Sequence, residues 1–467
     1  MVKSSQLSLP VAIVTLGCAK NQVDSEIMAG LLKQQGCVLV SDPAAAEVVI
    51  VNTCGFLKSS VSESIDCILD LAAFKTKGRL KRLIVAGCLF GRYGQELKKE
   101  LPEVDEFLPL SEIGTIGDWI TNKSRGQSRA LLRRTAGRTG CFLYDHLTPR
   151  ELGSPPHWAY VKIAEGCSRE CSFCVIPKIR GPFCSRSSES VLCEVRKLNS
   201  RGVREVNLVA QDLTAYGCDW PENRGREGLA LVKLLHEIDR SRSVEWVRLL
   251  YAFPSGVRSE LLEAIVELPS VCEYLDLPLQ HCSEKILRSM RRPLGRFSSR
   301  RIVEFIRKQA PQIKLRTTFL VGYPGESEKD LAELEEFILQ GHFWHVGVFE
   351  FSAEEGTAAA GLGAQIPKGE KAERRRRLMR AQQKVLSQAY KQLMGAQVPV
   401  MIDGCHAESE HFLVGRTRFQ APEVDSLVII NNLTCPAGRV RAGAVGLVEI
   451  TDTAGYDLVG TLKEVLG

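Results

Sequence analysis

Three cysteines of this chain, Cys167, Cys171 and Cys174, have the spacing that points most directly to chemistry. They follow an apolar run in the order C-x3-C-x2-C. Three thiolates in this order hold three irons of a 4Fe-4S cube and leave the fourth iron without a protein ligand. An iron with a vacant position can bind a small molecule and deliver an electron into it. The spacing therefore predicts a catalytic cluster.

A structural zinc site is the alternative interpretation of the same residues. Cys184 follows Cys174 closely enough to supply a fourth thiolate and close a tetrahedral site. A zinc-stabilised RNA-binding protein without catalysis is therefore a second hypothesis. Metal analysis separates the two, because two cubes would give about eight irons per chain.

Three further cysteines each end an apolar run, in Val11–Cys18, Val48–Cys54 and Leu83–Cys88. Each run is typical of a buried strand. Helical patterns over Ser25–Gln35 and Ser60–Phe74 lie between them, so the order predicts a parallel sheet with right-handed crossovers. All three thiols then emerge at the carboxyl edge of the sheet, where open α/β sheets bind ligands.

We therefore interpret Cys18, Cys54 and Cys88 as ligands of a second cluster with an open iron. An isolated cysteine is often a small buried apolar side chain, and this remains the alternative for each of them alone. The same offset after three successive strands favours a shared ligand.

The middle of the chain again alternates strand and helix patterns. Strands are expected at Ala159–Ile163, Glu205–Ala210, Val247–Ala252, Tyr274–Pro278, Leu315–Val321 and His345–Phe351, and helices at Ser188–Ser200, Ala230–Asp239, Ser259–Leu268, Ser298–Lys308 and Glu328–Gln340. Six such units predict a partial (β/α) barrel whose active site lies at the C-terminal ends of its strands. Candidate residues at these ends, besides Cys167, are Gln211, Asp212, Gln280, His281 and the turn Gly322–Glu326. The turn is either a place of close ligand approach or a tight βα loop, and His281 is expected to be a structural hydrogen bonder.

The C-terminal part changes character after a basic helix expected over Lys368–Arg380. From Gln397 to Gly467, short strands separated by Gly, Pro and Asn turns predict a small antiparallel barrel. Acidic residues outnumber basic ones nine to five in this segment. An acidic barrel is a poor surface for nucleic acid and a better match for a basic protein. The arginine run in the helix keeps a phosphate backbone open as a partner.

Length and composition set the outer limits. The 467 residues, 51.7 kDa, allow about three domains, and apolar and charged contents of 44% and 25% are ordinary for a globular protein. No apolar run has the length of a membrane span, and the first ten residues are too short and polar for a signal peptide. We therefore expect a cytoplasmic protein without a membrane partner, whose 16 cysteines stay reduced.

The cysteine motif, with Phe173 before its last cysteine, resembles the radical S-adenosylmethionine (SAM) enzymes. The order of cysteine domain, barrel and small β-barrel resembles their methylthiotransferase branch over essentially the full length. Three segments carry this resemblance: Leu16–Glu26, Ala210–Gly217 and Phe351–Thr357. Ala19 stands where that branch usually has proline, which leaves the neighbouring cysteine in place.

The resemblance implies a flavodoxin-like domain over 1–150, a radical SAM barrel over 151–396 and a TRAM domain over 397–467. It assigns two 4Fe-4S clusters to the six cysteines, with SAM at the barrel cluster. Phe173, Gln211 and Gly325 are candidates for SAM contact from their positions alone. The expected reaction inserts a methylthio group at the β-carbon of an aspartate of a small-subunit ribosomal protein, with electrons from a donor such as flavodoxin or ferredoxin. Two open clusters in one cavity suit the attack on an unactivated C–H bond.

A sister reaction, methylthiolation of a tRNA adenosine, is the principal alternative and would use the same six cysteines. The acidic terminal barrel argues against tRNA, and the Gln211–Gly217 motif favours the ribosomal protein. The arginine helix keeps the tRNA alternative open.

Overall fold

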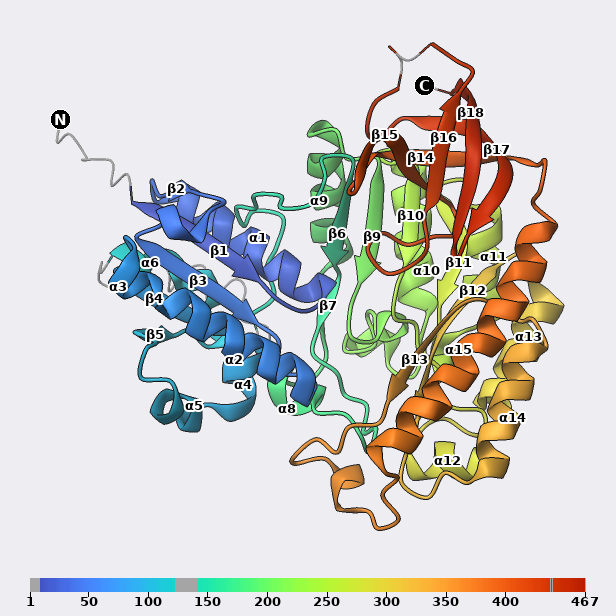
Figure 1. The fold of residues 1–467 in the computed structure, drawn as a ribbon, viewed down its shortest axis with the longest axis horizontal. Helices are drawn as coiled ribbons and strands as arrows, with labels where there is room; N and C mark the ends of the chain where they lie inside the picture. Colours follow the sequence, from blue (N-terminus) through green and yellow to red (C-terminus); the bar gives the residue numbers. More distant parts are fainter. Residues whose placement is uncertain (1–8, 122–141, 437, 439, 467) are drawn as a thin grey trace.

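The computed structural model describes residues 9–121, 142–436, 438 and 440–466. It folds them into two parallel sheets, one closed barrel and a two-stranded ribbon (Figure 1). Residues 1–8, on which the signal-peptide argument partly depends, lie outside this description. No helix of the described residues is long and apolar enough to cross a lipid bilayer.

The N-terminal sheet has the strand order β2-β1-β3-β4-β5, and all neighbouring strands are parallel. This is the flavodoxin-like order, as expected. The elements are β1 (Pro10–Thr15), α1 (Ala19–Gln34), β2 (Val38–Leu39), β3 (Val48–Thr53), α2 (Lys58–Ala72), α3 (Phe74–Lys77), β4 (Arg82–Gly87), α4 (Cys88–Tyr93), α5 (Gln95–Glu100), β5 (Glu106–Phe107) and α6 (Ile116–Thr121). β3 is buried along its whole length because helices cover both faces of the sheet.

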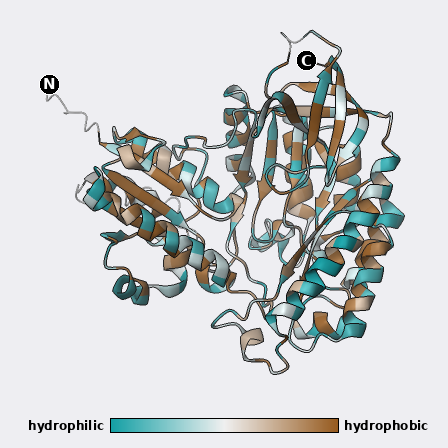
Figure 2. Ribbon diagram, in the orientation of Figure 1, coloured by the Kyte–Doolittle hydropathy of each residue, from teal (hydrophilic) through white to brown (hydrophobic). Residues whose placement is uncertain are grey.

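The central sheet has six parallel strands in the order β13-β12-β11-β10-β9-β6, which is sequence order. It curves into the expected partial barrel, with helices on its outside (Figure 1). The elements are β6 (Trp158–Lys162), α9 (Ser188–Ser200), β9 (Glu205–Val209), α10 (Leu229–Ser241), β10 (Trp246–Leu249), α11 (Ser259–Glu267), β11 (Val271–Asp276), α12 (Glu284–Ser289), α13 (Ser299–Gln309), β12 (Lys314–Val321), α14 (Glu328–Leu339), β13 (Phe343–Glu350) and α15 (Lys368–Lys391). The largest hydrophobic core lies between the strands and these helices, which turn polar faces outward (Figure 2).

The C-terminal segment closes into a barrel in the order β14-β15-β16-β18-β17. Its strands are β14 (Gln397–His406), β15 (Ser409–Thr417), β16 (Val428–Leu433), β17 (Val445–Ala454) and β18 (Asp457–Val465). The small barrel is therefore confirmed, with one difference in detail. β16 and β18 run parallel, whereas the other neighbouring pairs are antiparallel as expected. Closure leaves no free sheet edge.

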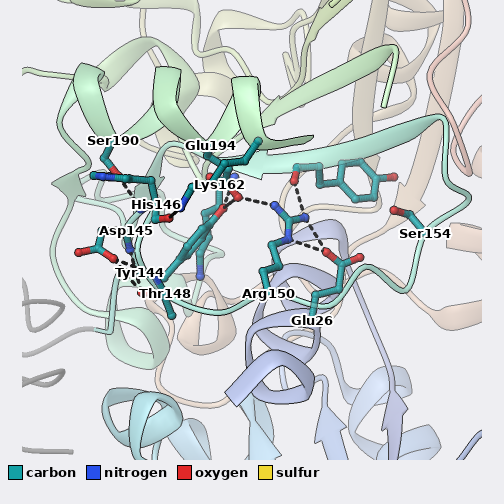
Figure 3. A network of polar contacts seen from close by, with 12 residues as sticks. Glu26, Tyr144, Asp145, His146, Thr148, Arg150, Ser154, Lys162, Ser190 and Glu194 are labelled. Carbon is teal, nitrogen blue, oxygen red and sulfur yellow. Dashed lines mark hydrogen bonds and ion pairs between the residues drawn. The ribbon is translucent and has the colours of Figure 1, made fainter. Parts of the chain in front are cut away.

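A latch around Arg150 fastens the N-terminal domain to the central barrel (Figure 3). The Arg150 guanidinium donates to Glu26 of α1 at 2.5 Å and to Glu194 of α9 at 2.6 Å. It also donates to the backbone oxygen of Tyr160 in β6 at 2.7 Å. Because these groups are buried, the ion pairs are shielded from water, and α1 is held against β6.

Candidate active site

Each of the three strand-end cysteines of the N-terminal domain lies where a strand passes into the next element. Cys18 directly precedes α1, Cys54 follows β3, and Cys88 is the first residue of α4. The three preceding strands are parallel neighbours. All three cysteines therefore emerge at the carboxyl edge of one sheet.

Glycines let the three cysteine loops pack against one another. A Cβ on Gly17, whose φ is +96°, would lie 2.9 Å from the Cβ of Cys54. A Cβ on Gly55 would lie 2.7 Å from the carbonyl oxygen of Cys88. Only a residue without a side chain fits at either point, so these loops come closer than larger residues would permit.

Asn21, in the first turn of α1, joins the loops by hydrogen bonds. Its Nδ2 donates to the carbonyl oxygens of Leu16 at 2.8 Å and Thr53 at 2.9 Å. Its Oδ1 accepts from Nη2 of Arg180 at 2.5 Å and lies 3.6 Å from Sγ of Cys88. The buried amide thus ties both neighbouring strand ends to the central barrel.

The three thiols have different electrostatic surroundings. Around Cys18, which water still reaches, nearby protein atoms oppose ionisation, but Lys20 and Arg180 outweigh them and lower the pKa of the thiol. Burial raises the pKa of Cys88 to about 11 against the attraction of Arg180, and burial also raises the pKa of Cys54. Since the thiolate is the form that binds metal, the cations favour the ligand form first at Cys18.

The second set of cysteines lies in the loop after β7 (Ala164–Glu165), the strand that pairs with β8 (Cys184–Ser185). The backbone N–H of Arg169 donates to Sγ of Cys167 at 3.4 Å, and that of Ile176 donates to Sγ of Cys174 at 3.5 Å. Nη1 of Arg292 lies 3.8 Å from Sγ of Cys171. Burial raises the pKa of Cys167 and, to about 12, that of Cys174, and repulsion from the neighbouring thiolates acts in the same direction.

Each donor set offers three thiols, the number that a cube with one open iron requires. Among the residues that the structure describes, no three Cys, His, Asp or Glu side chains are already grouped around a single point.

The two cysteine sets share one interface, formed by α8 (Ile176–Arg180) against α4. Cys88 packs with Val175 and Ile179 in a small apolar cluster, and Val175 directly follows Cys174. Nε of Arg180 lies 3.3 Å from Sγ of Cys88. The loop that carries the second set therefore touches a cysteine of the first.

Arg180 also belongs to a buried ionic network in the barrel mouth. Lys162 Nζ donates to Asp24 at 2.5 Å and to Glu165 at 2.6 Å, and Arg180 Nη1 lies 3.1 Å and 3.0 Å from the same two carboxylates. Burial opposes ionisation of Glu165, but Arg180 and Lys162 lower its pKa to about 2. Gln211 Nε2 donates to Glu165 at 2.6 Å, while its buried Oε1 has no hydrogen-bond partner among the described residues.

Phe173 and the turn Gly322–Glu326, two other candidates at strand ends, make local structural contacts. Phe173 packs beside a cluster formed by Ile286, Met290, Tyr323, Phe351 and Ala359. Gly325 has a φ of +80° and open space where a Cβ would stand, so the turn needs its conformation and not its small size. The carboxylate of Glu326 accepts the N–H of Gly322 at 2.8 Å, which makes the segment a tight loop.

His281 and Asp212 stabilise their own loops. Nδ1 of His281 accepts the backbone N–H groups of Cys282 and Ser283, both at 2.9 Å, so the ring is the expected structural hydrogen bonder. Burial lowers its pKa to about 4, which keeps the ring neutral. Asp212 accepts the N–H of Ala215 at 3.1 Å and pairs with Arg169 at 2.8 Å. Gln280 takes a φ of +73°, a strained conformation at the barrel mouth.

Sequence reasoning missed the polar residues around the cysteines, namely Lys20, Asn21, Asp24 and Arg180. The first three lie directly after Cys18 at helical spacing, and this could have marked them as one group. No sequence signal relates Arg180 to them, because the contact crosses two domains.

Three protein families match successive parts of the chain. The uncharacterized protein family UPF0004 matches residues 10–109, the radical SAM superfamily matches 161–338, and the TRAM domain matches 394–462. Each match falls on one of the three main sheets, and the radical SAM match ends before β13.

Several curated proteins are similar over nearly the whole chain, and each is called ribosomal protein uS12 methylthiotransferase RimO. The protein of Syntrophotalea carbinolica is 42% identical, covering 97% of this chain and 97% of its own. That of Anaeromyxobacter sp. (strain K) is 44% identical, with 96% and 92% covered. That of Geobacter sulfurreducens is 43% identical, with 97% and 98% covered.

Among solved structures, the radical SAM methyltransferase TsrM of Kitasatospora setae has a similar fold. The TM-score is 0.52 at 13% identity, with 74% of this chain and 72% of that chain covered. At this identity the similarity concerns the fold alone.

Proposed function

This chain belongs to the RimO family of ribosomal protein uS12 methylthiotransferases, and on that premise we propose its substrate. The enzyme inserts a methylthio group at the β-carbon of an aspartate of this small-subunit ribosomal protein. The observation that carries the proposal is the contact of Arg180, on the loop of one cysteine set, with Cys88 of the other. Sulfur transfer to carbon requires both sets at one reacting atom.

As a radical SAM enzyme, the chain uses a 4Fe-4S cluster and SAM. We propose Cys167, Cys171 and Cys174 as the ligands of this cluster, and Cys18, Cys54 and Cys88 as the ligands of a second. When bound, these groups supply the one-electron chemistry that breaks an unactivated C–H bond and the sulfur that replaces the hydrogen.

The chain's own residues bind and orient the reactants and keep water away from them. Phe173, Gln211 and Gly325 are proposed SAM contacts, and the unpaired Oε1 of Gln211 is an acceptor available for a ligand N–H or O–H group. The apolar packing of Val175 and Ile179 on Cys88 keeps water from one side of the thiol. The proposed division assigns 1–150 to the second cluster, 151–396 to radical chemistry and 397–467 to a TRAM domain, with a reduced flavodoxin or ferredoxin as electron donor.

The arginine run of α15 supports the protein substrate over tRNA. Its positive charge is largely engaged within the protein. The ion pairs are Arg374 with Glu326 and Glu370, Arg376 with Glu373, and Arg377 with Glu328 and Glu335. Arg375 is exposed and donates to the backbone oxygen of Val348, so it is the one arginine of the run without a carboxylate partner among the described residues.

The small barrel also lacks a basic face among its described residues. Five of its charged residues are used against the central barrel: Asp403, Arg416, Arg418, Glu423 and Asp425. The carboxylates of Glu408, Asp452 and Glu464 are exposed, as is Arg441. Because these acidic residues outnumber the arginine, the remaining surface is acidic. Arg439, counted in the sequence tally, lies outside the described residues. A basic protein remains the better partner.

The test offers the ribosomal protein and tRNA side by side to anaerobically reconstituted enzyme, with mass spectrometry of both. We expect methylthiolation of the ribosomal protein and none of tRNA, and the reverse result would overturn the proposal. Metal analysis should give about eight irons per chain for two cubes. Stoichiometric zinc without iron would contradict both clusters.

A further inference from the structure

Lys20 is a cation without a carboxylate partner in the described part of the chain. The residue is 8% exposed, and its ammonium lies over the ring of Tyr251, 3.3 Å from the ring centroid. The face of a ring attracts a cation but does not neutralise it. The ammonium nitrogen is not among the fully enclosed side-chain atoms that lack a hydrogen-bond partner, so a ligand can still reach it.

The nearby carboxylates are already engaged by other cations. Asp24 is one helical turn from Lys20 on the same face of α1, but its Oδ1 is bound by Lys162 and its Oδ2 by Arg180. Glu165 is bound by the same two cations. Lys162 and Arg180 thus occupy both carboxylates, and neither carboxylate forms an ion pair with Lys20.

Tyr251 is held rigidly in the place where Lys20 meets it. The residue follows β10 at the barrel mouth and has a φ of +66°, a strained conformation for a bulky side chain. Its N–H donates to Asp276 at 2.9 Å, and its carbonyl oxygen accepts from Leu213 at 2.9 Å. The backbone of Tyr251 is therefore held by hydrogen bonds at both of its peptide groups.

The position of Lys20 relates this charge to the chemistry. It is two residues beyond Cys18, and its ammonium reaches the barrel strand end that carries Tyr251. A ligand anion at Lys20 would consequently lie between the second-cluster cysteines and the mouth of the barrel.

We propose that Lys20 binds the side-chain carboxylate of the substrate aspartate, an inference that rests on the proposed function. The β-carbon of aspartate is bonded directly to the carboxylate carbon, so holding the carboxylate also holds the carbon to be modified. The bound anion gives the Lys20 ammonium the charged hydrogen-bond partner that the carboxylates of the described residues do not supply. Lys20 is thus a substrate-binding residue that favours aspartate over its neutral amide.

The competing role for Lys20 is to balance the charge of the thiolate at Cys18. Lys20 does lower the pKa of the Cys18 thiol, but its ammonium makes no hydrogen bond to this sulfur and lies over the Tyr251 ring. Cys88, by comparison, has a guanidinium directly at its sulfur. The geometry therefore favours an external anion, and the two roles differ in what the iron-sulfur spectra would show.

The experiment is a double-mutant cycle on binding, with cluster-loaded enzyme under anaerobic conditions. Full-length ribosomal protein is used with its target aspartate or with asparagine in its place. Wild-type enzyme should bind the asparagine form about 10- to 100-fold more weakly. Lys20→Met should bind both forms equally, with iron content and electron paramagnetic resonance (EPR) spectra unchanged.

Lys33→Met is the matched control, because Lys33 lies on the same helix, is exposed and pairs with Glu151 at 3.0 Å. It should discriminate aspartate from asparagine as wild type does. Lys20→Arg keeps the charge and should retain most of the discrimination. It serves as the test if the methionine variant fails to fold.

A Lys20→Met enzyme that still prefers aspartate by the wild-type factor would overturn the inference. A changed EPR spectrum or lost iron with unchanged discrimination would assign Lys20 to the cluster and also overturn it. If Lys20→Arg is the variant tested, complete loss of discrimination with intact clusters contradicts a role of charge. Wild-type enzyme that neither binds nor modifies the ribosomal protein would refute the proposed function itself.

Discussion

The two ends of the central sheet are both covered by another part of the chain, but their buried charges are balanced differently. At the amino ends of the strands, against the small barrel, Glu205 accepts from Arg248 at 2.9 Å and from Arg416 at 2.6 Å. Arg416 also binds Asp403 at 2.8 Å. Each of these four charged side chains has a partner of opposite sign.

At the carboxyl ends, against the N-terminal domain, one cation lacks a carboxylate partner among the described residues, namely Lys20. Oε1 of Gln211 also has no hydrogen-bond donor, as is true of Nδ1 of His157 at the amino ends. Tyr251 and Gln280 hold positive φ angles of 66° and 73°. The six cysteines also lie at this end.

This difference separates a structural interface from a functional one. A buried charge with a partner of opposite sign helps to hold two domains together. A charge without such a partner is retained where a ligand supplies the partner. Substitutions at the amino ends should therefore change stability, and those at the carboxyl ends should change chemistry.

The largest effect is expected for Cys171→Ala at the carboxyl ends. Loss of a proposed ligand of the barrel cluster should abolish cleavage of SAM, while the free energy of unfolding of the apoprotein changes by about 1 kcal/mol or less. Deoxyadenosine formation, measured by chromatography, and urea unfolding check the two parts. A variant that still forms deoxyadenosine at the wild-type rate would contradict the assignment.

Cys54→Ala should remove only one of two reactions. Its proposed cluster supplies sulfur, so deoxyadenosine should still form while methylthio insertion into the ribosomal protein stops. Both products are quantified in the same reaction mixture. Equal loss of both would mean that the two cysteine sets do not divide the chemistry.

Glu205→Gln tests the amino ends. Removing this charge leaves Arg248 and Arg416 with one carboxylate, Asp403, between them and should cost about 3 to 5 kcal/mol of unfolding free energy. Deoxyadenosine formation per folded molecule should persist. Glu273→Gln is the control, because Glu273 and Arg418 are partly exposed, and should cost about 1 kcal/mol or less. If urea unfolding shows the same loss of unfolding free energy for Glu205→Gln and Glu273→Gln, the buried ion pairs of Glu205 contribute no more than a partly exposed pair.

Acid should weaken the same interface gradually. Burial opposes ionisation of Glu205 and Asp403. Arg416 and Arg248 nevertheless hold the pKa of Glu205 below its usual value, and His157 and Arg416 do the same for Asp403. A lowered pKa in the folded state stabilises the protein above the unfolded pKa of about 4, and this stability is lost as the pH falls further. The melting temperature should therefore drop below about pH 4, less steeply in Glu205→Gln. Identical slopes would exclude Glu205 from the effect.

Local elements could be predicted from the sequence because their signals are local. The helix expected at Ser188–Ser200 has those same bounds, and strands expected at Ala159–Ile163 and Glu205–Ala210 begin and end within one residue of β6 and β9. Apolar periodicity reflects which face is buried, and a few neighbouring residues specify it. The basic helix was expected to end near Arg380 but continues to Lys391, since its later apolar residues pack on the small barrel.

Partners distant in sequence could not be predicted. The parallel pairing of β16 with β18 depends on barrel closure, and the engagement of the arginine run depends on α14 lying beside α15. Likewise, Arg180 meets Asn21 and Cys88 because α1 packs against β6, an arrangement to which the Arg150 latch contributes.

The sequence by itself determined the six cysteines, the strand ends that carry them and the order of sheet, partial barrel and closed barrel. Only the tertiary structure decided that the two cysteine sets share an interface and that Lys20 is left without a carboxylate partner. The physical reason is that periodicity and spacing act over a few residues, whereas the balance of buried charge is settled by side chains that folding brings together from distant segments.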